Sequence, residues 1–149
     1  MIRPATHQDI PRLVDLGAIM HATTSYKDRV YIPEKTGEFI GSLIDGLGVM
    51  FVAEVDGVVV GGLAGAVTEQ WFNTDLIAYE YCLFVEPSRR QGLLAMKLVI
   101  SFQEWARIKG AKEIHMGVTT GINTSSTARL YSRLGFKYDG PLMKMEVAQ

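Results

Sequence analysis

The sequence of 149 residues predicts a single mixed α/β domain, residues 1–149, with a central sheet and helices on both of its faces. Apolar residues recur at helical spacing in separate segments, which predicts amphipathic helices. Shorter runs rich in β-branched and aromatic residues lie between these segments and predict strands. The expected order of elements is β-α-α-β-β-β-α-β-α-β-β, and no internal repeat or linker-like stretch divides the chain.

Each element has a local signal in the sequence. Thr6 is a candidate N-cap, and Pro33 and Gly110 are typical of a helix start and of the residue after a helix end. Asp56-Gly57 indicates a tight hairpin, because both residues tolerate the positive φ that such a turn needs. The expected elements are strand 2–3, helix 7–21, loop 23–31, helix 33–46, strands 50–55, 58–67 and 76–85, a helix that ends near 109–110, strand 114–118, a helix closed by Gly135, and strands 136–138 and 142–147.

Composition narrows the classes of function. The formal net charge is −1, so the chain offers no general field that would attract nucleic acid or an anionic membrane. Its one cysteine, Cys82, excludes an intramolecular disulfide and fits a reducing compartment. No apolar run approaches the roughly 20 residues of a membrane-spanning helix, and the N-terminus lacks the apolar core of a signal peptide. We therefore expect a cytoplasmic protein with neither a nucleic-acid nor a membrane partner.

The stretch VEPSRRQGLLAMKL, residues 85–98, carries the main functional signal. An apolar strand runs into a turn with proline, then paired arginines, a glycine and a long amphipathic helix. The first amides of such a helix have no intrahelical partners, and the helix dipole places partial positive charge there. Gly92 would let a phosphate approach the backbone, and Arg89 or Arg90 would add charged hydrogen bonds. This pattern predicts an anion site.

Two motifs, VEPSRRQGLLA and TARLYSRLGF, together with the order of the elements, make the chain resemble the GCN5-related N-acetyltransferase (GNAT) superfamily. The resemblance covers essentially the full chain. It implies a mostly antiparallel central sheet and acetyl-CoA as co-substrate, without a metal. The first motif departs from the family pattern at Leu94, where a second small residue is usual. The family often has asparagine at the position of Thr124, and here Asn123 lies one residue earlier.

The resemblance also implies which residues hold the acyl-CoA. The pantetheine arm would pair with the backbone of the strand, and the pyrophosphate would meet the loop and the start of the helix. The implied contacts are Leu83, Phe84, Val85, Arg89, Arg90, Gln91, Gly92, Leu93, Leu94, Ala95, Asn123 and Thr124.

Two side chains are candidates for proton transfer. Tyr131 matches the tyrosine of the family's fourth helix, which implies a general acid that protonates the leaving thiolate. Its position on the apolar face of that helix also fits a core tyrosine. Glu80 is the candidate general base if it faces the cleft, and an ordinary solvated residue if it faces away. His21 and His115 are alternative bases, because histidine titrates near neutral pH.

Other candidates have more ordinary interpretations. Cys82 is expected to be a buried strand residue, and the histidines and the cysteine show no metal-ligand spacing. Trp71-Phe72 is expected to cover the edge of the core or to form a dimer contact, with substrate binding as the alternative. The aromatic and basic residues 26–29, with Tyr31, are candidates for the wall of the acceptor site.

The resulting hypothesis is an N-acetyltransferase that moves an acetyl group from acetyl-CoA to a primary amine of a small molecule or a protein. A non-catalytic acyl-CoA-binding module with the same fold is the alternative. Nucleic-acid binding through Arg89, Arg90 and Arg107 is poorly supported, because the chain has no basic stripe. A homodimer is compatible with the exposed edges of the predicted sheet.

Overall fold

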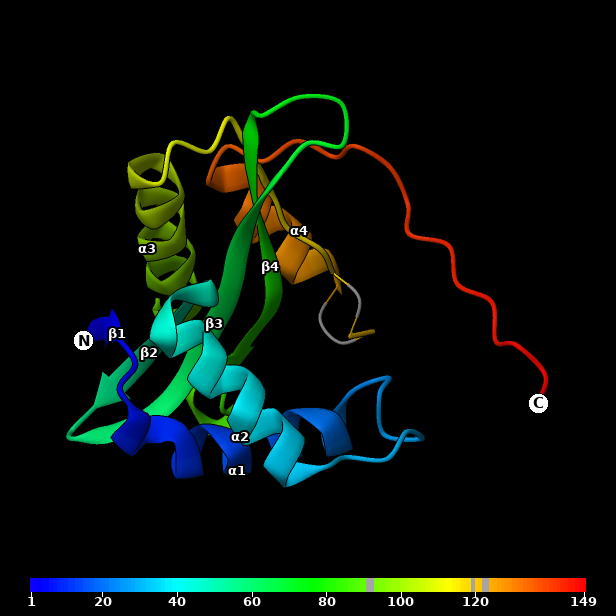
Figure 1. Cartoon of the computed structure of the whole chain (residues 1–149). Helices are drawn as coiled ribbons and strands as arrows, with labels where there is room; N and C mark the ends of the chain where they lie inside the picture. The colour runs from blue at the N-terminus through cyan, green and yellow to red at the C-terminus, as the bar shows by residue number, and fades with distance from the viewer. Residues whose placement is uncertain (91–92, 119, 122–123) are drawn as a thin grey trace.

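The computed structural model describes residues 1–90, 93–118, 120–121 and 124–149. In this part of the chain, five strands form one sheet in the order of the sequence (Figure 1). The strands are β1 (Ile2–Pro4), β2 (Val49–Val55), β3 (Val58–Glu69), β4 (Leu76–Val85) and β5 (Glu113–His115). The first four strands are antiparallel neighbours, and β5 runs parallel to β4. The predicted mixed, mostly antiparallel sheet is confirmed.

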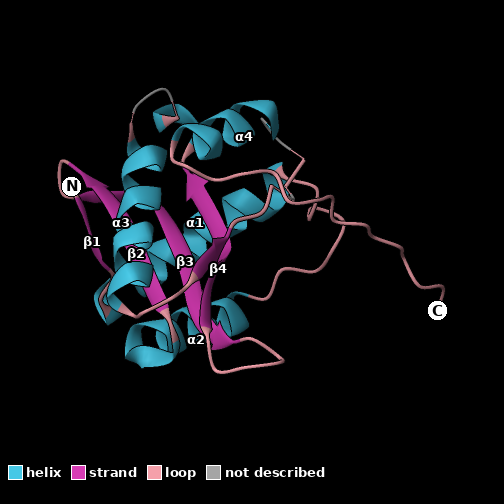
Figure 2. Ribbon diagram, turned by 90° about the horizontal axis from the view of Figure 1, so that it is seen from above, coloured by secondary structure: helices cyan, strands magenta, loops and turns pink. Residues whose placement is uncertain are grey.

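Helices cover both faces of this sheet, as the sequence predicts (Figure 2). One face packs on α1 (Ile10–Thr23) and α2 (Pro33–Ser42), and the other packs on α3 (Leu94–Ile108) and α4 (Thr124–Arg133). A 3₁₀ turn at His7–Asp9 precedes α1, and a π-helical turn at Leu43–Leu47 ends the second helical segment. The order of the first nine predicted elements is therefore correct.

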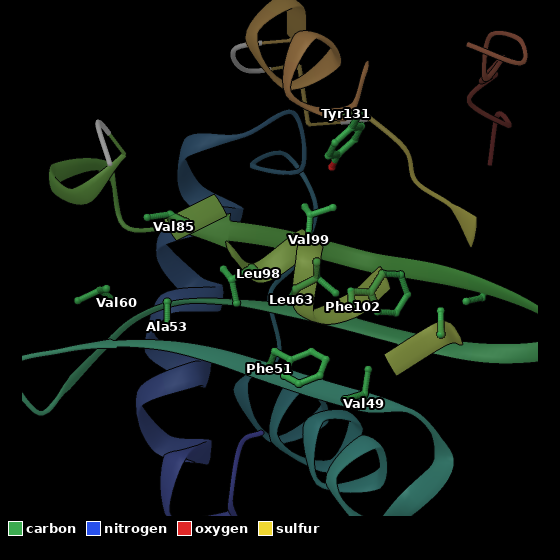
Figure 3. Close-up of a cluster of buried hydrophobic side chains, with 12 residues drawn as sticks. Val49, Phe51, Ala53, Val60, Leu63, Val85, Leu98, Val99, Phe102 and Tyr131 are labelled. Carbon is green, nitrogen blue, oxygen red and sulfur yellow. The ribbon is translucent and has the colours of Figure 1, made fainter. Parts of the chain in front are cut away.

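The Asp56-Gly57 turn and Gly65 show how single residues determine the shape and packing of the sheet. Asp56 has a φ of 50° and Gly57 a φ of 78°, so both adopt the left-handed conformation that the Asp-Gly signal predicts. Gly65 faces the ring of Phe102 on α3, and a Cβ at this position would overlap that ring. The absence of a side chain at Gly65 therefore lets Phe102 pack directly on β3, where it is fully buried. Phe102 belongs to a cluster of buried hydrophobic side chains that includes Leu63, Leu98 and Tyr131, and Figure 3 shows this cluster.

The last two predicted strands are wrong. Residues 136–149 form neither strand nor helix and extend away from the domain (Figure 1). Beyond Phe136, which packs against the core, their apolar side chains are exposed, with Tyr138 at 85% and Met143 at 83%. The local alternation is strand-like, but a strand forms only where another strand offers its hydrogen-bonding edge. The neighbouring strand β5 is three residues long, rather than the five predicted for 114–118.

The aromatic pair Trp71-Phe72 lies at the surface. Trp71 is 92% exposed and packs edge-to-face on Phe72 at the β3–β4 connection, so this pair does not cover the core. Burial fails here because the two rings lie in a turn that extends beyond the helices on either face. Over the described residues, no helix is both long and apolar enough to cross a bilayer.

Candidate active site

The pairing between β4 and β5 is short and leaves part of β4 uncovered. Ile77, Ala78 and Tyr79 pair with Glu113, Ile114 and His115, and the parallel ladder ends there. From Glu80 to Val85, no strand of the described residues continues along this edge of β4. Backbone donors and acceptors on an uncovered edge need other partners, which a ligand can supply. A cavity of about 520 Å³ lies at this edge, within the size range of ligand pockets.

Glu80 lines this cavity, because an irregularity in β4 changes the direction of its side chains. Ala64 of β3 pairs with Cys82 and Gly65 pairs with Glu80, so β4 carries one extra residue at this point. Glu80 Oε1 accepts a hydrogen bond of 2.9 Å from the backbone N–H of Gly117, across the gap between β4 and the segment after β5. Burial raises the pKa of the Glu80 carboxyl, and the hydrogen bond from Gly117 partly opposes that rise.

Tyr131 lines the same cavity from the opposite side. It lies on α4, is 7% exposed and packs against Phe136, with ring centroids 5.6 Å apart. Figure 3 shows its side chain reaching from α4 toward the sheet. Burial, followed by the nearby charge of Glu80, raises the pKa of the Tyr131 hydroxyl well above its usual range. The hydroxyl therefore stays protonated at neutral pH. Tyr131 therefore belongs to the core and also to the cavity wall, and its role as a general acid stays a prediction.

Cys82 completes this part of the wall. Burial and the charge of Glu80 raise the pKa of the Cys82 thiol to about 12. A thiol with that pKa is protonated at neutral pH and is a poor nucleophile. Cys82 lies in β4 as expected, and it is half-buried rather than fully buried.

The predicted phosphate region lies at the other end of the cavity. Leu83, Phe84, Val85 and Arg90 line it, together with Leu93 and Ala95 at the start of α3. Arg90 folds back onto β4, where its Nε donates a hydrogen bond of 2.8 Å to the carbonyl oxygen of Val85. Its guanidinium also lies over the Phe84 ring, 5.2 Å from the centroid. These contacts fix the turn between β4 and α3.

Leu94 differs from the family pattern without intruding on this region. It packs against the hydrophobic cluster under α3, whereas its neighbours Leu93 and Ala95 line the cavity. The larger side chain at this position is therefore accommodated in the core. This could not be inferred from the motif, because the direction of Leu94 depends on where the helix begins.

The remaining predicted cofactor contacts are placed differently or not at all. Arg89 is exposed and does not line the cavity. Thr124 is exposed at the first residue of α4, whereas Ser126 and Thr127 of the same helix line the cavity. Gln91, Gly92 and Asn123 lie outside the described residues. The roles of all five in cofactor binding stay predictions.

One wall of the cavity, formed at the end of α1, has little signal in the sequence. Met20 and Thr24 at the end of α1 line the cavity, as does Tyr26, which belongs to the aromatic loop proposed for the acceptor site. The N–H of Ser25 donates a hydrogen bond of 2.9 Å to the carbonyl oxygen of Thr120. This contact joins segments about a hundred residues apart, and no periodicity in the sequence encodes it. Only the unusual aromatic content of the loop was a usable signal.

The two candidate histidines do not line the cavity. His115 is half exposed and lies 2.8 Å from the carboxylate of Glu113 on β5. His21 lines a separate, smaller cavity on the other face of the sheet. Glu80 is therefore better placed as a base than either histidine. Across the described residues, no group of three or more histidine, cysteine, aspartate or glutamate side chains is arranged to hold a metal ion.

Known proteins share both the sequence pattern and the fold. The family described as Acetyltransferase (GNAT) domain matches residues 46–138, more than half of the chain. Aminoglycoside N(6′)-acetyltransferase type 1 of Salmonella typhimurium is 28% identical over 90 residues, which are 58% of this chain and 61% of that protein. The protein of the same name from Salmonella enteritidis has the same identity and coverage. The chain thus spans about three-fifths of the length of these curated relatives.

Solved structures reproduce the whole fold at low identity. A transcriptional regulator from Bacillus halodurans C-125 has a TM-score of 0.81 and 20% identity, with 99% of each chain covered. AAC(6′)-Iy in complex with the bisubstrate analog CoA-S-monomethyl-acetylneamine has a TM-score of 0.80 and 16% identity, with 100% of this chain and 98% of that chain covered. The family match over residues 46–138, on this shared fold, shows that the chain belongs to the GCN5-related N-acetyltransferase superfamily.

Proposed function

We propose that the protein transfers the acetyl group of acetyl-CoA to a primary amine of a small molecule by direct attack in a ternary complex. One observation carries this proposal: Glu80 and Tyr131 line a single cavity beside the uncovered edge of β4. The names of the curated relatives, aminoglycoside acetyltransferases, support a small-molecule acceptor.

The uncovered edge of β4 suits the extended arm of acetyl-CoA. The arm carries amide groups, which would pair with backbone groups of Leu83 to Val85 much as an added strand would. The phosphates would then lie toward the first amides of α3, where the helix dipole favours negative charge. Arg90 would contribute its guanidinium, which the bond to Val85 holds at the end of β4.

The reaction forms a C–N bond and breaks a C–S bond, and the attacking nitrogen loses two protons while the sulfur gains one. Glu80 takes a proton from the incoming ammonium, directly or through a water, and its raised pKa makes it a stronger base than an exposed glutamate. The free amine attacks the thioester carbonyl, which a backbone N–H near Phe84 or Val85 polarises. Tyr131 donates its proton to the departing thiolate, because its hydroxyl is protonated at neutral pH, and the nitrogen releases its second proton to Tyr131 as the amide forms.

Calorimetric titration with acetyl-CoA, dephospho-CoA and pantetheine tests the binding step, and release of free thiol with a panel of amines tests the transfer. Binding that survives loss of the 3′-phosphate and weakens when the pyrophosphate is removed is the expected result. Acetyl-CoA binding without thiol release from any amine would instead favour the non-catalytic binding module. No binding at millimolar acetyl-CoA would contradict both. A protein amine as acceptor, a homodimer and a cytoplasmic location stay predictions.

A further inference from the structure

A second cavity of about 270 Å³ lies between the sheet and the helices α1 and α2. We refer to it as the apolar chamber. Its walls include Leu13, Leu16, Met20, Tyr31, Phe39 and Ile40. A cavity of about 150 Å³ is enough to hold benzene in an engineered protein, so the apolar chamber has room for a substituted ring.

The apolar chamber adjoins the cavity that contains Glu80. Both are lined by Met20, Tyr26, Tyr81, Cys82 and Phe84. They lie toward different faces of the sheet, but the edge of β4 between them carries no neighbouring strand among the described residues. A molecule whose body occupies the apolar chamber can therefore extend an amine around this edge toward Glu80.

The charges of the two cavities do not suit a polycation. None of the described residues that line the apolar chamber is an aspartate, glutamate, lysine or arginine. In the larger cavity, Glu80 is the sole carboxylate among the described lining residues, which also include the cationic side chains of Arg90 and Arg133. Each ammonium group buried without a carboxylate partner is strongly unfavourable. An acceptor with several ammonium groups would have one partner at most.

One polar atom of the apolar chamber points to a further feature of its ligand. His21 Nε2 is buried and has no hydrogen-bond partner among the described residues. The His21 ring lies 5.4 Å from the ring of Tyr31, whose hydroxyl is engaged with the carbonyl oxygen of Val14 at 2.7 Å. A buried polar atom without a partner is destabilising, and a ligand hydroxyl or N–H near His21 would remove that cost.

We infer that the acceptor is a primary monoamine with an aromatic or bulky apolar body that carries one hydrogen-bonding group, with the body in the apolar chamber and the amine at Glu80. This rests on the proposed acetyl transfer and restricts its acceptor. Amino sugars with several ammonium groups are expected to be poor acceptors, in contrast to the substrates named for the relatives.

The first experiment compares thiol release with tyramine, 2-phenylethylamine, ethylamine and neamine, a polyamine sugar. We expect kcat/KM for tyramine to exceed that for ethylamine and neamine by at least about tenfold, because even one methylene in an apolar pocket changes this ratio by about 10–200-fold. Tyramine should also exceed 2-phenylethylamine, because its hydroxyl can reach His21.

Two variants connect this preference to the apolar chamber. Thr36→Phe narrows it from α2, and Lys35→Phe places the same ring on the exposed surface of that helix as a matched control. The ratio of kcat/KM for tyramine to that for ethylamine should fall about tenfold more in Thr36→Phe than in Lys35→Phe. His21→Phe should bring tyramine and 2-phenylethylamine close to equality. Melting curves of each variant establish that it is folded.

Several outcomes would overturn the inference. Faster turnover of neamine than of tyramine would reject the acceptor class while leaving the acetyl transfer in place. Equal ratios in Thr36→Phe and Lys35→Phe would place the apolar body elsewhere. Absence of acetyl-CoA binding would contradict the proposed function itself, and the acceptor assignment with it.

Discussion

The two parts of β4 differ in their neighbours, and their chemistry differs accordingly. Residues Ile77 to Tyr79 lie between β3 and β5, whereas from Glu80 onward β3 is the sole strand that pairs with β4 within the part of the chain that the structure describes. In the enclosed part, Ala78 is fully buried and contributes packing. In the open part, the strand carries an ionisable group and borders the larger cavity. The same strand thus stabilises the fold where its ladder is complete, and offers backbone groups and a carboxylate where the ladder ends.

The largest expected effect comes from the open part. Glu80→Gln keeps the size of the side chain and removes the base, so we expect kcat/KM for thiol release to fall about 10²–10⁴-fold. Glu113→Gln is the matched control, because Glu113 belongs to the strand that covers the enclosed part and is exposed. Similar rates in the two variants would show that Glu80 is not the base.

The same substitution has a separate effect on stability. Because burial raises the pKa of Glu80 in the folded state, the folded protein binds more protons than the unfolded chain above the ordinary value of 4.5. The contribution of Glu80 to the free energy of unfolding therefore falls as the pH rises from that value through the raised pKa. Denaturant titrations of wild type and Glu80→Gln over this range should show that decline in wild type only.

The hydrophobic cluster to which Ala78 of the enclosed part belongs also contains Phe102, and its variants should affect stability rather than catalysis. Phe102→Ala removes the ring that packs on Gly65, and we expect the free energy of unfolding to fall by about 3–5 kcal/mol. Ile100→Ala is the control, since Ile100 is on the same helix and exposed to solvent. Denaturant unfolding measures both, and the KM for acetyl-CoA of the folded Phe102→Ala protein should stay close to that of wild type. A loss of turnover without a loss of stability would contradict the assignment of Phe102 to the core.

Tyr131 belongs both to the core and to the cavity wall. A substitution that keeps its ring therefore separates a role in packing from a role in proton donation. Tyr131→Phe keeps the ring and removes the proton donor, and we expect kcat to fall about 10–100-fold. This is less than for the base, because a thiolate with an ordinary pKa near 8.5 already leaves readily. Tyr138→Phe, on the exposed tail, is the control. Normal turnover with a large loss of stability would make Tyr131 a core residue only.

The smallest effect is expected at Arg90, in the part of the cavity that is predicted to bind the phosphates of acetyl-CoA. Arg90→Ala should raise the Kd for acetyl-CoA about tenfold, because it removes one charged contact and the bond that fixes the turn. Arg107→Ala removes the same charge from the far end of α3 and should leave the Kd unchanged. Arg90→Lys is not expected to restore binding, since lysine cannot reproduce the planar contact with Val85 and Phe84. Equal Kd values in Arg90→Ala and wild type would contradict the role of Arg90.

The difference between the parts of β4 also explains what could be predicted from the sequence. The helices and the Asp56-Gly57 hairpin follow from local spacing and turn chemistry, and the structure confirms them. The direction in which the Glu80 side chain points does not follow from local spacing, because it depends on the register shift between Ala64 and Gly65 of the neighbouring strand β3. Where a strand gains or lacks a partner is a property of the whole sheet, and this is also why strands 136–138 and 142–147 were predicted wrongly.

In the candidate site too, features set by adjacent residues could be predicted, whereas features that depend on distant segments could not. Val85 and Arg90 of the motif at residues 85–98 line one cavity, since a strand, a turn and a helix are adjacent in the chain, and their contact with the cofactor stays a prediction. The apolar chamber could not be predicted, because Leu13, Ile40 and Ala64 come from three distant segments. Each of these residues looks like ordinary core in the sequence.

The most direct test of the role of Glu80 is the pH dependence of kcat/KM for thiol release with a single amine, in wild type and Glu80→Gln. A base works when deprotonated, so the wild-type rate should rise with pH through an apparent pKa above the ordinary value of 4.5. That rise should be absent in Glu80→Gln, while the rise due to the substrate ammonium at higher pH should remain in both. Identical profiles in the two proteins would contradict a catalytic role for the carboxylate at the open edge of β4.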